Sequence, residues 1–416
     1  EYHIETQPVG SYFQSDEIID FKQGSINIPS PTEPVFIPDN EIIDKIFAKS
    51  KDLTYKMGKL SNNDNIDYYI NGNSFFSKHI GIVGSTGSGK SCSVAKIIQQ
   101  VAGINNALNI NKDNQKNSHI IIFDIHSEYK NAFSLAESEN FTLNNLDVEK
   151  INIPYWLMNS EELESLFIES NEMNSHNQIS QFKRAVILSK EKHNPGKKIT
   201  YDMPVYFDIK EVYNFIYNLN CEVISKIDGE YGNPKLKDGR LIEDITEYLN
   251  STFDFVSSST AAATKASNGP FNGEFERFLT RIETKLNDKR LNFITNAKKD
   301  DGSEFKTEDF SVILRQFIGY IDKANISIID LSGVPFEVLS ITVSLVARLI
   351  FDFAFHYSKN KHKINEQNDI PFMIVCEEAH NYIPKDDGAE YNASKKSIER
   401  IAKEGRKYGL SLMVVS

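Results

Sequence analysis

The chain has 416 residues, of which 40% are hydrophobic and 25% charged, and its formal net charge is -12 at pH 7. This length predicts two or three domains, and the acidic balance excludes a surface that is basic all over, so any nucleic-acid contact must come from a local concentration of Lys and Arg. No purely apolar run reaches the roughly 18 residues that a membrane span needs, so no membrane contact is predicted.

The cysteine pattern indicates the compartment. Cys92, Cys221 and Cys376 lie far apart and form no CxxC pair, which is typical of a reduced cytoplasmic protein rather than a disulfide framework or a zinc site. No signal peptide is recognisable. Because the sequence begins at Glu1 without a methionine and stops within a strand-like run, we expect it to be part of a longer protein.

The first part of the chain, up to residue 76, carries short alternating segments broken by Gly and Pro. Helical periodicity occurs there only near Glu41–Ser50. Short strands between turn residues predict a small β-rich domain.

From His79 the pattern becomes apolar strand, glycine loop, helix and second apolar strand, the last at His119–Tyr129. Further strands are predicted at Ile326–Gly333, Pro371–His380 and Leu410–Ser416, with a long amphipathic helix between the first two of these. Fully apolar strands that alternate with helices predict an α/β fold around a parallel sheet covered on both faces.

Residues 156–314 interrupt this pattern with a polar, mostly helical sequence rich in Glu, Lys and Asn. The stretch Ser257–Gly269 is low in complexity. We interpret the segment as a helical insertion that contains a flexible loop.

A phosphate-binding motif follows the first apolar strand. Gly84, Gly89, Lys90 and Ser91 satisfy G-x-x-x-x-G-K-[ST] between a predicted strand and a predicted helix. In such a loop, backbone N–H groups cradle the phosphates, the lysine reaches the β and γ phosphates, and the serine hydroxyl binds Mg²⁺. The predicted nucleotide-binding residues are Gly84, Ser85, Thr86, Gly87, Ser88, Gly89, Lys90, Ser91 and Cys92.

Two glutamates follow another apolar strand. Nucleotide hydrolysis needs one carboxylate for the magnesium shell and another for the attacking water. We assign Glu377 to the metal, where aspartate is commoner, and Glu378 to the water. The alternative is that both glutamates only open the next helix, where its dipole favours them.

Other acidic residues end core strands, where the sites of open α/β folds gather. Asp124, His126 and Glu128 follow the second strand, and Asp330 ends a later one. We favour a supporting role near the nucleotide or water over a metal site, and simple turn formation by Asp124 or Asp330 stays open.

A basic cluster occupies Ser394–Gly409. Phosphoryl transfer is commonly assisted by an arginine supplied in cis or by a neighbouring subunit. We rank Arg406 first for this role, because it precedes the last strand beside the strand of the two glutamates, and Arg400 second. For the lysines of the cluster, a solvated helix face is the preferred interpretation.

These motifs together resemble the HerA family of hexameric DNA-translocating ATPases, which are related to the FtsK translocases. The resemblance rests on six segments in the family's order, namely Lys78–Ser91, Ile120–Tyr129, Ile151–Leu163, Ile328–Ser340, Ile374–Pro384 and Ile401–Ser416. It implies a P-loop (RecA-like) NTPase core with a partial N-terminal β-barrel, ATP and Mg²⁺ as ligands, and a homo-hexameric ring on double-stranded DNA. It also implies a nuclease or Sir2-like effector partner, in DNA-end processing or antiviral defence.

With this resemblance we divide the chain into four parts. Residues 1–76 form the partial barrel, 77–155 the first part of the ATPase core, 156–314 the insertion, and 315–416 the second part of the core, truncated after the last strand. The family's polar sensor and Arg-Pro segment after that strand do not occur here, so the sensor stays unassigned. Asn381–Lys396 is the candidate pore loop and Lys190–Lys198 a weaker one, with a disordered surface loop as the alternative for both.

The expected function is an ATP-dependent helicase or translocase. A conjugative coupling ATPase for single-stranded DNA is one alternative, and the lack of a recognisable membrane anchor counts against it. The other is an assembly scaffold, in which ATP-driven ring formation activates a partner without movement along DNA.

Overall fold

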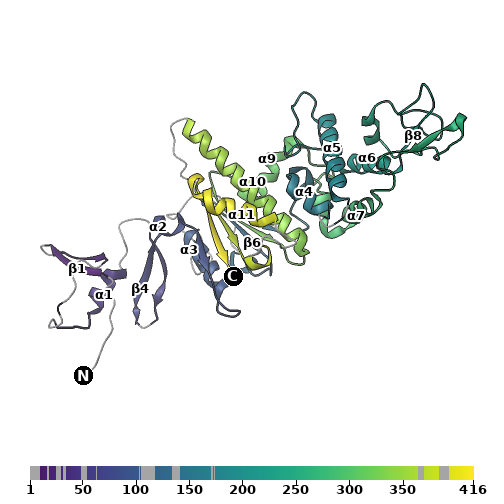
Figure 1. The fold of residues 1–416 in the computed structure, drawn as a ribbon. Coiled ribbons are helices and arrows are strands. Elements are labelled where there is room, and N and C mark those ends of the chain that lie inside the picture. Colours follow the sequence, from purple (N-terminus) through teal and green to yellow (C-terminus); the bar gives the residue numbers. More distant parts are fainter. Residues whose placement is uncertain are drawn as a thin grey trace.

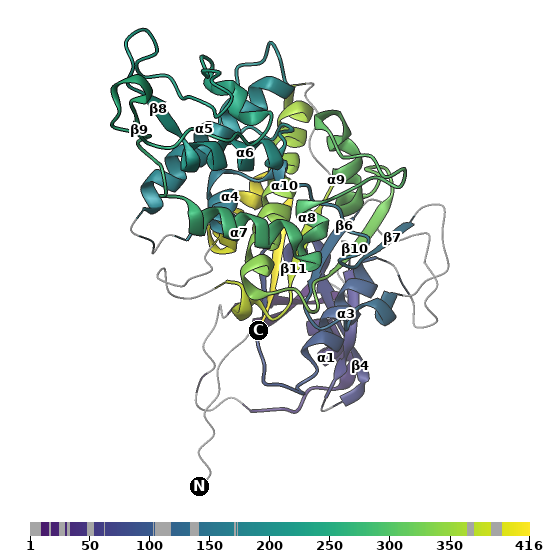
Figure 2. The same ribbon diagram turned by 90° about the vertical axis from the view of Figure 1, so that its right-hand side faces the viewer.

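The computed structural model describes residues 10–15, 18–24, 30, 34–47, 54–61, 63–102, 104, 118–133, 141–169, 172, 174–363, 370–383 and 393–416. Three regions follow one another in space (Figures 1 and 2): the N-terminal strands at one end, a central sheet with its helices, and a mostly helical region at the other end. The chain therefore has its α/β core in the middle of an elongated arrangement.

The central sheet is parallel, as the sequence predicts, and it has six strands, one more than the sequence predicts. Its strands are β5 (Ile80–Ile82), β6 (His119–Asp124), β7 (Phe141–Leu146), β10 (Ala324–Asp330), β11 (Phe372–Cys376) and β12 (Leu410–Val415). The spatial order is β5-β12-β11-β6-β10-β7, and each neighbouring pair is parallel. All carboxyl ends therefore lie at one edge, which we call the carboxyl edge.

Alternating side chains of the strands face two different helix layers. On one face, Ile120 and Ile122 join a core cluster with Val94 and Ile98 of α3 (Lys90–Val101). On the other face, Ile121 and Phe123 belong to a larger cluster, which includes the apolar sides of α10 (Phe336–Lys363) and α11 (Ala393–Glu404). This double cover explains why β6 is buried along its whole length.

Helix α10 is long and apolar enough to cross a membrane by length and composition alone. Its segment Val338–Lys363 has a mean hydropathy of 1.9 in its most apolar window, and 78% of that window is buried inside the protein. Such burial is typical of a core helix. The sequence prediction counted only purely apolar runs and therefore did not anticipate the high hydropathy of this helix.

The segment between β7 and β10 leaves the sheet, as expected for an insertion. It contains α4 (Ser160–Phe167), α5 (Ser175–His193), α6 (Ile209–Cys221), β8 (Val223–Ser225), β9 (Ala266–Asn268), α7 (Glu276–Asn287), α8 (Asn292–Thr295) and α9 (Phe310–Ile318). Strands β8 and β9 form a small antiparallel pair. The stretch that we interpreted as a flexible loop is therefore partly a strand, because β9 lies within it.

The N-terminal region contains β1 (Gly10–Ser15), β2 (Ile18–Gln23), α1 (Asn40–Phe47), β3 (Thr54–Leu60), β4 (Asn63–Asn71) and α2 (Gly72–Phe76). In the described residues, β1 pairs with β2 and β3 with β4, as two separate antiparallel hairpins. The β-rich character is present, but a barrel is not confirmed, because each strand pairs only with its sequence neighbour. The domain boundaries stay predictions.

Candidate nucleotide-binding site

The phosphate-loop sequence lies where β5 ends and α3 begins, at the carboxyl edge. Gly87 and Gly89 have φ angles of 79° and 86°, which residues with a Cβ rarely adopt. A Cβ on Gly84 would lie 2.5 Å from the Ser88 hydroxyl. Gly89 is the N-cap of α3, so no N-cap side chain occupies the N–H groups of the first turn. This backbone fits a phosphate group.

The two predicted motifs meet across the sheet. The Ser91 hydroxyl donates to Glu377 Oε1 at 3.1 Å, and Lys90 Nζ lies 3.9 Å from Glu378 Oε1. Lys90 Nζ also donates to the carbonyl oxygen of Gly84 at 2.9 Å. A hydroxyl and a carboxylate are oxygen ligands of the kind that Mg²⁺ takes in phosphate sites. The donor set therefore fits a magnesium nucleotide, and Ser91 and Glu377 are the residues that would hold the metal.

Glu377 is buried, with only 1% of its surface exposed, and both of its carboxylate oxygens accept hydrogen bonds. The Ser91 hydroxyl donates to Oε1, and the Tyr129 hydroxyl donates to Oε2 at 2.6 Å. Burial raises the pKa of Glu377 above its usual range, and the hydrogen bonds from Tyr129 and Ser91 oppose that rise. The Tyr382 hydroxyl also donates to the main-chain carbonyl of Glu377 at 3.0 Å. The carboxylate is thus held in one orientation.

Glu378 has a left-handed backbone with φ 45°, which is uncommon for a residue other than glycine. Its Oε1 faces Lys90, and its Oε2 lies 3.4 Å from His380 Nδ1. A short 3-10 helix (Ala379–Asn381) follows, so the glutamates do precede a helix. Their contacts with Lys90 and Ser91 show that they also face the phosphate loop.

The end of β12 adjoins the phosphate loop. The backbone N–H of Ser416 donates to the Ile82 carbonyl, and the backbone N–H of Gly84 donates to the Ser416 carbonyl. The Ser416 hydroxyl lies 3.1 Å from His380 Nδ1. The sequence left this position unassigned.

Asp124 forms a turn after β6. Its carboxylate accepts N–H bonds from His126 and Glu128, both at 3.2 Å, and from Tyr129 at 3.0 Å. This is the turn interpretation that the sequence left open, and the turn carries Tyr129 to Glu377. Burial raises the pKa of Asp124, and the three N–H bonds oppose the rise. In the described part of the chain, no group of three or more His, Cys, Asp and Glu is placed to hold a metal.

Asp330 ends β10 beside the same turn. It accepts a hydrogen bond from the Ser127 hydroxyl at 2.6 Å, and Ser127 has a left-handed φ of 58°. Burial by itself would raise the pKa of Asp330, but hydrogen bonds from Ser127 and Ser332 outweigh it and hold the pKa below its usual range. Asp330 therefore fastens the turn to the next strand.

Neither candidate arginine reaches the glutamates of its own chain. Arg406 precedes β12, and its Nε donates to the Ser77 carbonyl at 2.9 Å, just before β5. Because the strands are parallel, Arg406 lies at the edge opposite the phosphate loop, so the expected position beside the glutamates is wrong. Arg400, on α11, lies over the Phe351 ring at 4.3 Å and 3.8 Å from Asp352.

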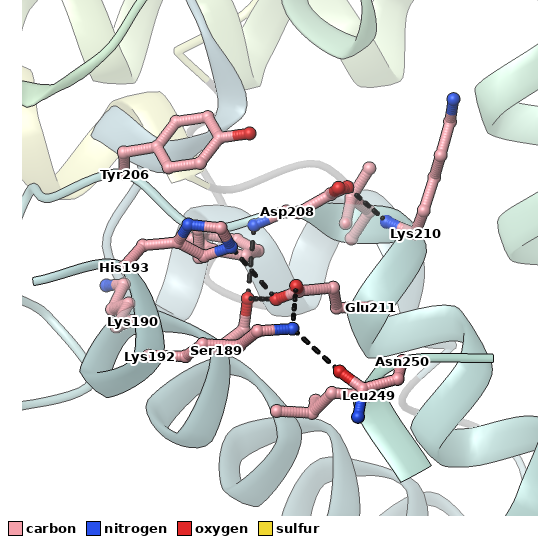
Figure 3. A network of polar contacts seen from close by, with 12 residues as sticks. Ser189, Lys190, Lys192, His193, Tyr206, Asp208, Lys210, Glu211, Leu249 and Asn250 are labelled. Carbon is pink, nitrogen blue, oxygen red and sulfur yellow. Dashed lines mark hydrogen bonds and ion pairs between the residues drawn. The ribbon is translucent and has the colours of Figure 1, made fainter. Parts of the chain in front are cut away.

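The weaker pore-loop candidate, Lys190–Lys198, is a loop only in its second half, because α5 ends at His193. Lys190 lies in α5, is fully buried, and donates to the carbonyls of Tyr201 and Met203. Lys192 is bound to Glu211 at 2.7 Å (Figure 3). Lys190 and Lys192 are therefore bonded within the insertion, whereas Lys197 and Lys198 lie exposed in the loop after α5, so a pore-loop role of that loop stays a prediction. Of the main candidate, Asn381–Lys396, residues 384–392 lie outside the described residues.

Sequence reasoning did not single out Tyr129, Tyr382 and His380. Aromatic residues beside strands are more often core residues than parts of a site. The only signal was the position of Tyr129 at the end of the turn that Asp124 begins.

Two solved structures resemble the chain with low TM-scores. VirB4 of Thermoanaerobacter pseudethanolicus has a TM-score of 0.46 and 12% identity, over 88% of this chain and 77% of that one. The plasmid coupling protein TrwB in complex with ADP and Mg²⁺ has a TM-score of 0.41 and 12% identity, over 91% of this chain and 71% of that one. The family assignment rests on the sequence matches instead.

Two curated relatives are DNA double-strand break repair helicases HerA. The protein of Sulfolobus acidocaldarius is 25% identical over 93% of this chain and 59% of its own length, and that of Sulfurisphaera tokodaii is 26% identical over 93% and 59%. The chain thus spans about three fifths of the length of these relatives. Residues 55–350 match the family model described as the central domain of helicase HerA. Since this match covers more than half of the sequence, the chain belongs to the HerA family.

Proposed function

We propose that the chain is the motor part of a protein that hydrolyses ATP with Mg²⁺ and moves along double-stranded DNA as a ring. One observation carries the proposal. Ser91 and Lys90 of the phosphate loop contact Glu377 and Glu378, the two residues that follow β11. A phosphate loop alone would support nucleotide binding. The two glutamates add the carboxylates that hydrolysis requires, one for the metal and one for the attacking water.

Each residue has a role in this proposal. The loop N–H groups and Lys90 bind the phosphates, Ser91 and Glu377 hold the metal, and Glu378 orients the attacking water. Magnesium, when bound, neutralises charge on the phosphates. The contact between Glu378 and Lys90 places the carboxylate next to the phosphate region, where it can accept a hydrogen bond from water.

An arginine for the phosphate would come from a neighbouring copy. Arg406 and Arg400 are both exposed, and Arg406 lies at the edge opposite the phosphate loop, beside Ser77. In a ring of copies, the arginine edge of one would face the phosphate loop of the next, with Arg406 ahead of Arg400. We take a homo-hexamer as the ring, following the family resemblance.

The names of the relatives support DNA as the track, and the partner and setting are proposed from the family resemblance. Both curated relatives are named for DNA double-strand break repair, which supports double-stranded DNA as the track. A nuclease or Sir2-like effector would be the partner, in DNA-end processing or antiviral defence in the cytoplasm. Local basic groups must bind the DNA, since the formal net charge is -12.

The test is the ATPase rate of the full-length protein with and without double-stranded DNA, with the oligomeric state measured in the same samples by mass photometry. A DNA-stimulated hexamer supports the motor. A ring whose hydrolysis ignores DNA contradicts it and supports the scaffold alternative.

The arginine assignment has its own test, in which Arg406→Ala is mixed with Lys90→Ala. Each variant alone should be inactive. Mixed rings should regain part of the ATPase, since some interfaces then pair an intact loop with an intact arginine. Absence of recovery in rings shown to be mixed would exclude Arg406, and the same mixture with Arg400→Ala would then be measured.

A further inference from the structure

A chain of hydrogen bonds leads from the end of β6 to the phosphate loop. Asp124 Oδ2 accepts the N–H of Tyr129 at 3.0 Å, and the Tyr129 hydroxyl donates to Glu377 Oε2 at 2.6 Å. Ser91 donates to the other oxygen of Glu377. Asp124, Tyr129 and Glu377 are each no more than 1% exposed, so water does not compete for these bonds.

We propose that Tyr129 is a positioning residue for Glu377, and that Asp124 acts on Glu377 through Tyr129. The inference rests on the proposed function, since it concerns the carboxylate on the metal side of that site. Neither residue needs to touch the nucleotide or the metal.

The geometry gives the reason. The ends of β6 and β11 are neighbours, because Phe123 pairs with Cys376 and the N–H of Glu377 points to the Phe123 carbonyl at 3.4 Å. The turn after β6 therefore brings Tyr129 to the acidic residue after β11. Ser91 alone would hold a single oxygen of Glu377. The second donor fixes the plane of the carboxylate, and with it the direction of the oxygen that faces Ser91.

A role in packing alone is separable from this one. The Tyr129 ring belongs to the core cluster with Phe133 and Ile122, and phenylalanine would preserve that packing. Removing only the hydroxyl leaves Glu377 Oε2 buried without its donor, so the carboxylate must reorient or draw in water. Outer partners of metal ligands that are changed in this way typically cost about 10- to 100-fold in metal affinity or activity.

The experiment measures equilibrium binding of a fluorescent ATP analogue to the full-length protein, as a function of Mg²⁺ concentration and in EDTA. Tyr129→Phe should raise the Mg²⁺ concentration for half-maximal binding about tenfold or more and leave binding in EDTA unchanged. Asp124→Asn should give the same defect. The single amide oxygen of Asn can still accept the N–H bonds of His126 and Glu128, but its NH₂ group cannot accept the N–H bond of Tyr129. Combined with Tyr129→Phe, Asp124→Asn should add nothing to the Mg²⁺ defect.

The matched control is Tyr248→Phe. Tyr248 is also fully buried, and its hydroxyl donates to a buried glutamate, Glu222, at 2.8 Å, but within the insertion. This variant should cost stability comparable to that of Tyr129→Phe in thermal denaturation and leave the Mg²⁺ dependence unchanged.

The outcomes separate the two levels of the argument. If the wild-type protein shows no Mg²⁺-dependent nucleotide binding, the proposed function falls, and this inference falls with it. If the wild-type protein shows Mg²⁺-dependent binding and Tyr129→Phe needs the same Mg²⁺ concentration, only the positioning role is overturned. A defect of equal size in EDTA would also overturn it, because the loss would then concern the phosphate loop as a whole.

Discussion

Lys90 and Glu378 face each other at the carboxyl edge, with Nζ 3.9 Å from Oε1. One follows β5 and the other follows β11, so only the folded sheet brings them together. The left-handed backbone of Glu378 turns its carboxylate toward the lysine. Strained backbone of this kind is commonly stored where function depends on orientation.

Glu378→Gln should separate binding from hydrolysis. The substitution keeps the shape and removes the charge, so hydrolysis should fall by about 10²- to 10⁴-fold. Nucleotide binding should be equal or tighter, since the lost charge is negative and lies near the phosphate site. Phosphate release and equilibrium binding are the two measurements. Glu243→Gln, an exposed carboxylate in the insertion, should change the rate little, and equal hydrolysis rates for Glu378→Gln and the wild type would contradict the role of Glu378.

Gly89→Ala should weaken nucleotide binding. Gly89 has a φ of 86°, and a Cβ in the left-handed region costs about 1–2 kcal/mol, which corresponds to about 5- to 30-fold in affinity if the loop leaves its conformation. Gly81→Ala is the control, because Gly81 lies in β5 with no atom within 4 Å of an added Cβ. Isothermal titration with ATP compares them, and equal affinities would show that the cradle tolerates the strain.

Arg348→Ala should strongly destabilise the junction between core and insertion. Arg348 of α10 donates to the buried carboxylate of Glu162 and to the Leu157 carbonyl, both at 2.7 Å. Loss of one partner leaves a buried charge unpaired, at about 3–5 kcal/mol. The exposed pair Lys396–Glu161 predicts at most about 1 kcal/mol for Lys396→Ala. Urea denaturation of both variants decides, and similar midpoints would contradict the prediction.

Lys190 predicts a pH dependence of stability. Burial lowers its pKa to about 8, whereas the unfolded chain keeps the ordinary value of roughly 10.4. Between these values the unfolded state binds more protons, so the free energy of unfolding should rise with pH, by at most about 1.4 kcal/mol per unit.

The free energy of unfolding of the wild type is compared with that of Lys190→Met, measured by denaturation at several values from pH 7 to pH 10. The variant loses bonds to Tyr201 and Met203 at every pH. The gap between wild type and variant should nevertheless widen above pH 8. A constant gap would show that Lys190 keeps an ordinary pKa.

Most of the sheet could be predicted because its strands are buried on both faces and are therefore almost wholly apolar. β7 was missed: it is an edge strand with the sequence FTLNNL, and its Asn144 bonds to polar groups of β10 and α9. Its polar pattern reflects tertiary partners that no local window contains. The phosphate loop was predictable for the opposite reason, since its chemistry requires fixed residues at fixed local spacing.

The errors at charged residues have a common physical origin. Lys190 occurs in a polar, lysine-rich stretch, and its carbonyl partners are supplied by a later segment. Arg406 was expected near the glutamates from strand adjacency, but a residue before a parallel strand lies at the edge opposite the residues that follow one. Tyr129 escaped notice because its hydroxyl matters only through a contact with a residue far along the chain.

The opposite placement of Arg406 and the phosphate loop has a consequence for assembly, under the proposed arrangement in trans. Each copy would carry two unlike halves of a site, so contacts between copies would be head to tail. An open row would always leave one loop without an arginine and one arginine without a loop. Only closure completes every site, and a copy with a defective loop or a defective arginine would impair only the one site that uses that half. Turnover per chain should therefore be highest in closed rings.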